Sequence, residues 1–227
     1  MYGSQYNPLD SKAPNVPFVQ PKSLFRFGEQ TIWSSQFLQG NVGIASTQNR
    51  LFSVAQGSQG QGFTNALSIA ETNLKEGGKV PAGVAYDVFG VGCQIMHGNQ
   101  AGDGGTTSIA ADTQVLIRDE QNIINNGALS WSFTQTQIDI CPVALAGAGG
   151  GLFGAVSQNA AGANSGAMNN GNGQIWMYRK HPVALPGNTT FTILLSFGSR
   201  AAALSANNYC VVRTVLFGYY KNIIEIG

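Results

Sequence analysis

Large apolar residues alternate with small polar residues along several stretches of this chain. In residues 129–134 each odd position is large and apolar, and each even position is a serine or threonine. Residues 191–197 repeat this pattern, with Phe191, Ile193 and Leu195 on one side. A period of two residues places alternate side chains on opposite faces of a strand. Both stretches are therefore predicted to be strands with one face in a core.

Further strands are predicted from the same kind of pattern. Residues 84–96 carry one apolar side, and residues 209–220 are β-branched or aromatic on both sides, which indicates a central strand that is covered on each face. Shorter candidate strands are residues 50–54, 113–118 and 174–180. Only residues 64–75 have a spacing that could form a helix, and this spacing is ambiguous.

About seven or eight strands with no helix between them favour an antiparallel sandwich over a parallel α/β sheet. Their connections differ greatly in length, which favours Greek-key connections over simple hairpins. We therefore expect an all-β fold, an antiparallel jelly-roll sandwich with a single jelly roll. A compact double jelly roll, divided near residues 98–107, is the alternative.

Two segments differ from the rest in composition. Prolines 8, 14, 17 and 21 are spaced through polar sequence, which predicts an extended N-terminal arm over residues 1–23 and a folded domain over residues 24–227. Residues 142–173 are rich in Ala, Gly, Asn and Ser, and predict a long loop that is mobile alone and becomes a contact in an assembly.

Charged residues make up only 10% of the chain, whereas an average soluble domain has about 25%. Asn, Gln, Ser, Thr and Gly take their place, and these residues can bond to a neighbouring subunit without burying a formal charge. The net charge of +1 gives little repulsion between copies. Composition thus indicates an assembly subunit, although a secreted β-domain rich in neutral polar residues has the same composition.

Composition also bears on partners and location. Twelve Lys and Arg against eleven Asp and Glu make no basic field, so we expect no sequence-specific nucleic-acid binding. The first residues lack the pattern of a signal peptide, and no apolar run approaches the roughly 18 residues of a membrane span. We expect synthesis in a cytoplasm, with the three cysteines reduced and buried, and membrane contact stays open.

Candidate chemical motifs lack the context that each would need. The glycines at 149, 151 and 154 match a dinucleotide fingerprint without its strand, helix and acidic residue. A zinc site would draw on residues without a Cys-x-x-Cys pair: Cys93, His97, Cys141, His181 and Cys210. The carboxylates that could serve a glycosidase are scattered: Glu71, Asp87 and Asp139. We predict no enzyme activity, no metal and no cofactor.

Several segments together resemble a known family. Residues 79–83 lead into the strand at 84–96, and residues 182–190 lead into the strand at 191–197. A closing strand at 211–220 and a proline-bearing arm complete the arrangement. It resembles the jelly-roll major capsid proteins of tailless icosahedral bacteriophages.

The resemblance implies a structural subunit of an icosahedral viral shell, which self-assembles into capsomers and is located in the virion. Its partners would be copies of itself and minor capsid or vertex proteins. The residues expected to make the arm and loop contacts are Pro14, Pro17, Pro21, Gly149, Gly151, Leu152 and Phe153.

A binding module is the alternative from another functional class. Such a β-sandwich would bind carbohydrate or a receptor from a virion spike or a cell surface. Flat aromatic rings stack on sugar faces, and the candidates are Trp33, Trp176 and Tyr178. Aromatic residues on strands are more often part of a core or an interface.

Overall fold

The computed structural model describes most of the chain from residue 23 onward. The described residues are 23–40, 44, 49–63, 65–99, 109–148, 152–159, 162–169, 173–178, 180–204 and 208–225. The predicted arm lies outside them except for Ser23, which is the first residue of a strand.

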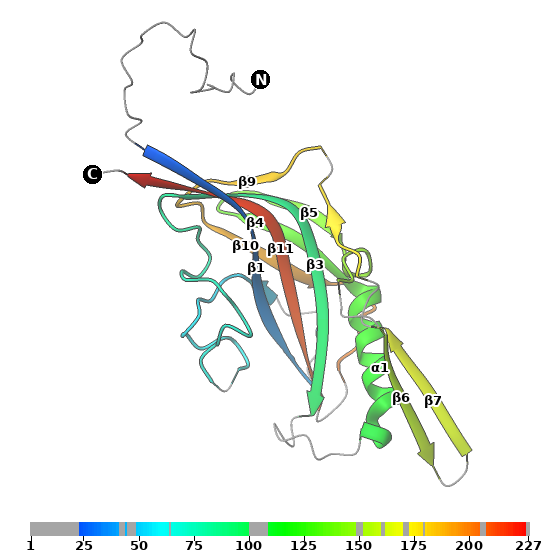
Figure 1. Ribbon diagram of the computed structural model, residues 1–227. Helices are drawn as coiled ribbons and strands as arrows, with labels where there is room; N and C mark the ends of the chain where they lie inside the picture. The colour runs from blue at the N-terminus through cyan, green and yellow to red at the C-terminus, as the bar shows by residue number, and fades with distance from the viewer. Residues whose placement is uncertain are drawn as a thin grey trace, which may run out of the picture.

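Two antiparallel sheets form the body of the molecule (Figure 1). The larger sheet has the order β1 (Ser23–Gln39), β11 (Asn208–Glu225) and β3 (Val84–Asn99), with β8 (Trp176–Met177) and β9 (Val183–Leu185) both on the far edge of β3. The smaller sheet has the order β2 (Asn49–Leu51), β10 (Phe191–Phe197), β4 (Gly127–Phe133) and β5 (Gln137–Pro142).

The strand pairs are nested along the chain. β1 pairs with β11, β2 with β10, β3 with β8 and β9, and β4 with β5, so the first strand meets the last and the middle strands meet each other. The amide of Tyr178 donates to the carbonyl of Phe89 at 2.8 Å, which makes β8 and β9 two parts of one edge. An antiparallel ribbon folded over in this way is a jelly roll. The expected all-β jelly-roll sandwich is therefore confirmed, and the two sheets together make up a single jelly roll.

The core lies between the two sheets. Trp131 on β4 is 1% exposed, and its ring centroid lies 6.0 Å from that of Phe191 on β10. The Trp131 indole N–H donates to the hydroxyl of Tyr178 at 2.8 Å, so its one polar atom is satisfied inside the core. Phe191, Ile193 and Leu195 of β10 are buried, as the alternation predicts, and Phe197 at the end of the strand is partly buried.

A helix replaces one predicted strand. Residues 113–118 lie inside α1 (Ile109–Asn126), so their prediction as a strand was wrong. The run 115–117 is apolar and partly β-branched, which favours strands locally. The helix instead buries Asp119, Glu120 and Ile123, which share one side at the spacing of a helix. Tertiary packing has overridden local propensity here.

The ambiguous helix at 64–75 is also absent from the described part of that segment. Residues 65–75 form turns and isolated bridges, such as Gln59 with Ala66 and Ser34 with Thr72. Of the shorter candidate strands, residues 50–54 contain the end of β2, and residues 174–180 contain β8.

Part of the predicted loop at 142–173 is regular. It contains a short 3₁₀ turn, η2 (Val143–Leu145), and a hairpin of β6 (Leu152–Asn159) and β7 (Gly162–Asn169), which lies along α1 and projects from the sandwich (Figure 1). These two strands were not expected from the sequence, because hydrogen bonds between main-chain groups join β6 to β7 and do not depend on the type of side chain. Gly, Ala, Asn and Ser give no alternating apolar signal that would reveal it.

The inner and outer positions of β10 can be compared by mutation. We predict that Leu195→Ala lowers the free energy of unfolding by about 2–5 kcal/mol, because Leu195 is fully buried and its removal leaves a cavity. Leu194→Ala, one residue away on the half-buried outer face, should cost about 1 kcal/mol or less. Urea unfolding of both variants measures the difference, and equal losses would contradict this assignment of faces.

Candidate assembly surface

The outer face of the larger sheet carries an apolar surface that the chain leaves partly open. On β11 the inward residues Cys210, Val212, Thr214 and Leu216 are fully buried. The intervening residues point to the other face of the sheet. Among these, Tyr219 is 50% exposed, so the second face of this central strand is not sealed by the protein itself.

Strand register determines which side chains meet on this outer face. Phe217 lies between Thr31 of β1 and Gly90 of β3, and Tyr219 lies between Glu29 of β1 and Asp87 of β3. The register of β3 shifts between Phe217 and Gly218 of β11. Such an irregularity leaves one extra residue on the longer strand, and here it is Phe89, whose ring centroid lies 5.0 Å from that of Tyr219.

Two glycines of β3 make room for the large side chains. A Cβ atom at Gly90 would lie 2.9 Å from Cδ1 of Ile175, and one at Gly92 would lie 3.3 Å from Cε2 of Phe217. Without these Cβ atoms, Ile175 and Phe217 lie directly on the backbone of β3. Met177 lies beside them, because β8 pairs with β3 at Gly90.

We call this group the aromatic face, defined by Phe89, Ile175, Met177, Phe217 and Tyr219. Met177 is 46% exposed, and the other members apart from Tyr219 are half-buried. Exposed apolar groups that gather in one place mark interaction sites more often than single exposed residues do. The aromatic face therefore has the chemistry of a contact surface.

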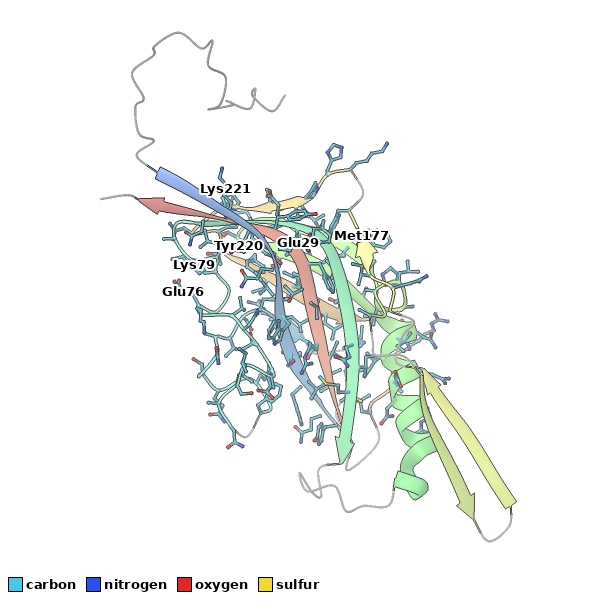
Figure 2. All side chains as sticks on the ribbon, viewed as in Figure 1. Glu29, Glu76, Lys79, Met177, Tyr220 and Lys221 are labelled. Atoms are coloured by element: carbon cyan, nitrogen blue, oxygen red, sulfur yellow. The ribbon has the colours of Figure 1, made fainter. Side chains whose placement is uncertain are left out.

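Acidic residues flank the aromatic face. Glu29 and Asp87 are exposed, and each is a register partner of Tyr219, one on either side. Figure 2 shows Glu29 and Met177 in the same upper part of the larger sheet. Lys221, two residues after Tyr219 on the same side of β11, is also exposed. A partner that covers the face would thus meet apolar rings bordered by two carboxylates and one lysine.

The chain covers the neighbouring part of the sheet with its own loop. The Trp33 indole N–H donates to the carbonyl of Ile69 at 2.9 Å, and the Asn73 amide donates to the carbonyl of Thr31 at 2.8 Å. The Arg213 guanidinium donates to the carbonyl of Ala70 at 2.7 Å. These bonds hold residues 69–73 against β1 and β11. The loop therefore borders the aromatic face without closing it.

A groove of about 770 Å³ lies at the margin of this loop. Among its lining residues are Phe37, Phe63 and Tyr209, whose rings contact one another through Phe37, with centroids 5.7 Å and 5.1 Å apart. Phe37 and Tyr209 lie on the same side of the larger sheet as Phe217 and Tyr219.

The predicted contact residues are not tested by this geometry. Pro14, Pro17, Pro21, Gly149 and Gly151 lie outside the described residues. Leu152 and Phe153 begin β6, opposite Asn169 and Met168, and their side chains are not among those described. Their roles in assembly therefore stay predictions.

Sequence reasoning missed the aromatic face. The apolar pattern on both sides of residues 209–220 predicts a strand that the protein covers on both faces. Only one face is sealed. Register then brings residues from three separate segments together, and no local pattern contains that information.

The three rings proposed for sugar stacking are engaged within the protein. Trp33 is half-buried and bonded to Ile69, and Tyr178 accepts the hydrogen bond from Trp131. Trp176 is half-buried and packs against the core. These three side chains do not form one open platform.

The cysteines are free and buried, as the sequence predicts. Burial raises the pKa of Cys93 to about 11 and that of Cys141 to about 12. Burial, together with the negative charges of Asp119 and Glu120, raises the pKa of Cys210 to about 12. All three thiols therefore stay protonated at neutral pH, when they are poor nucleophiles and poor metal ligands.

The other candidate groups remain apart. Glu71 accepts hydrogen bonds from Ser68 in the loop, Asp87 lies on β3 of the larger sheet, and Asp139 lies on β5 of the smaller sheet. Within the described residues, no group of three or more His, Cys, Asp or Glu side chains is placed to hold a metal ion.

One carboxyl group is buried without a hydrogen-bond partner. Glu120 of α1 is 2% exposed, and neither of its carboxylate oxygens has a partner. Burial raises its pKa to about 7, because the surroundings disfavour the charged form. Glu120 is therefore largely protonated below neutral pH.

This shift predicts how stability depends on pH. The folded protein holds the Glu120 proton more tightly than the unfolded chain does, so the contribution of this group falls as the pH rises from about 4.5 to about 7 and is constant above that. The shift corresponds to a loss on the order of 3 kcal/mol. In Glu120→Gln this loss should be absent. Urea unfolding at about pH 5 and pH 8 measures it.

Glu76→Gln is the matched control, because the Glu76 side chain is 51% exposed and pairs with Lys79 at 3.7 Å. It should keep the pH dependence of the wild type. An unchanged dependence in Glu120→Gln would show that Glu120 does not carry the effect.

Comparisons with protein-family models, with curated proteins and with solved structures give no match for this chain. Among the described helices, none combines the length and the apolar character needed to cross a membrane.

Proposed function

We propose that this protein is a structural subunit of an icosahedral viral shell, which self-assembles into capsomers and has no enzymatic role. The observation that carries the proposal is the aromatic face, where Met177 and Tyr219 are about half exposed on the outer side of a jelly-roll sheet. The arm and the segment 142–173 provide further contacts in this proposal, and the protein is part of the virion.

The fold is compatible with this role, since viral capsid proteins are among the users of jelly rolls. Fold alone does not assign function, because one fold serves many roles. The surface is therefore the stronger argument. The chain has only 10% charged residues, and an apolar cluster lies on the outer face of its larger sheet.

Low charge suits a subunit that is covered by its neighbours on several sides. Burying a formal charge in an interface costs free energy unless the charge is paired, whereas neutral polar side chains need only a hydrogen-bond partner. Each contact can then be modest. Contacts add up in a closed shell, because every subunit binds several others.

The alternative, a carbohydrate- or receptor-binding module, gains no specific support. Its three candidate rings are half-buried and two of them hold internal hydrogen bonds. The exposed rings of the aromatic face lie on a sheet face and not in an enclosed pocket, which fits a protein partner better than a small ligand.

The role of the aromatic face in assembly can be tested by introducing charged side chains into it. We predict that the double variant Met177→Lys and Tyr219→Lys raises the concentration needed for assembly at least about tenfold, because two charges would have to be buried in the contact. Positions 177 and 219 are 46% and 50% exposed, so a charged side chain at either position reaches water in the free subunit and the fold should be retained. Light scattering against concentration measures assembly.

Ile138→Lys is the matched control. Ile138 is 52% exposed and lies on β5 of the smaller sheet, so the variant places a charge at an equally exposed apolar position away from the aromatic face. It should assemble like the wild type. Equal assembly of the double variant and the wild type would remove the aromatic face from the proposal.

A further inference from the structure

We propose that the aromatic face binds the proline-rich segment 12–21 of a second copy of the chain. This inference rests on the proposed self-assembly and names the partner of the open surface. The acceptor consists of Phe89, Ile175, Met177, Phe217 and Tyr219.

The chemistry of the segment fits an aromatic acceptor. Pro14 and Pro17 are three residues apart, and the apolar residues Val16, Phe18 and Val19 lie beside them. Proline at this spacing favours the extended polyproline II conformation, which loses little entropy on binding. Segments of this kind dock on surfaces lined by aromatic rings.

The acceptor is built in the way that such a segment needs. The rings of Phe89 and Tyr219 contact each other, and the partly exposed Met177 lies beside Gly90, the next residue after Phe89. Because Gly90 and Gly92 have no side chains, Ile175 and Phe217 pack against the backbone of β3 and do not project far from the sheet. An extended segment can lie on a shallow apolar surface without any rearrangement of the sheet.

The acceptor has an excess of negative charge, because Lys221 offsets only one of the two carboxylates beside it. Glu29 and Asp87 flank Tyr219, and both are exposed. Lys12 and Lys22 lie on either side of the proline motif, and Asp10 is the one acidic residue among the first 22. A lysine near these carboxylates would add attraction and orient the segment.

Distance along the chain favours a second copy over the same copy. Glu29 is the sixth residue after Ser23 on β1, about 20 Å away at 3.3 Å per residue. Pro17 is six residues before Ser23, so binding to its own face would require the chain to reverse at Lys22 and then run back fully extended. Binding to a second copy requires no reversal.

Photo-cross-linking in the full chain tests the contact directly. The variant Phe18→p-benzoylphenylalanine is prepared once with ¹⁴N and once with ¹⁵N. Equal amounts of the two preparations are mixed, assembled, irradiated and digested. We expect cross-links from position 18 to peptides that contain Phe89, Met177 or Tyr219, with mixed-isotope pairs as frequent as random exchange predicts. The particles must form before irradiation, and electron microscopy establishes this.

A charge exchange is the second test. The variant Lys12→Glu and Lys22→Glu should raise the concentration needed for assembly about tenfold, and adding Glu29→Lys and Asp87→Lys should restore it. Arg50→Glu with Arg200→Glu is the control, because both arginines are exposed, one on β2 of the smaller sheet and the other in the turn after β10. It should have no effect.

The outcomes separate the inference from the proposed function. Failure of the unmodified chain to assemble would overturn both. Normal particles with cross-links only within one isotope, or only to other surfaces, would overturn the inference and leave the proposed function intact. Loss of assembly that the opposite charges do not restore would also overturn it.

Discussion

The pairing of β11 on both of its edges is the constraint on which the rest of the structure depends. β11 is bonded to β1 along one edge and to β3 along the other, and both partners are long strands. Its main-chain groups are thus satisfied inside the sheet, as buried backbone must be. Its side chains can therefore point only to one of the two faces of the sheet. Four of them point into the core: Cys210, Val212, Thr214 and Leu216.

The same pairing creates the surface that needs a partner. Because alternate residues of a strand face opposite ways, a strand that is apolar on both sides must present one side outward. The loop at residues 69–73 covers part of that outward side and leaves the aromatic face. In a chain with 10% charged residues, a neighbouring subunit is the natural cover, and this is the core of the proposed shell function.

Local patterns were enough to predict β3, β4, β10, β11 and the fold class, because alternation reports directly which positions face a core. They did not reveal the long strand β1. They failed for α1, where an apolar run was predicted as a strand, and for the β6–β7 hairpin, whose small residues give no alternating signal. The aromatic face was beyond sequence reasoning for another reason. Phe89, Met177 and Tyr219 meet only through register and an irregularity in β3.

Negative-stain electron microscopy of the purified chain over a range of concentrations, paired with light scattering, tests the central claim most directly. The account predicts closed shells, sheets or discrete ring-shaped capsomers that increase with concentration. A chain that stays a monodisperse monomer at high concentration and over a broad range of salt would contradict it.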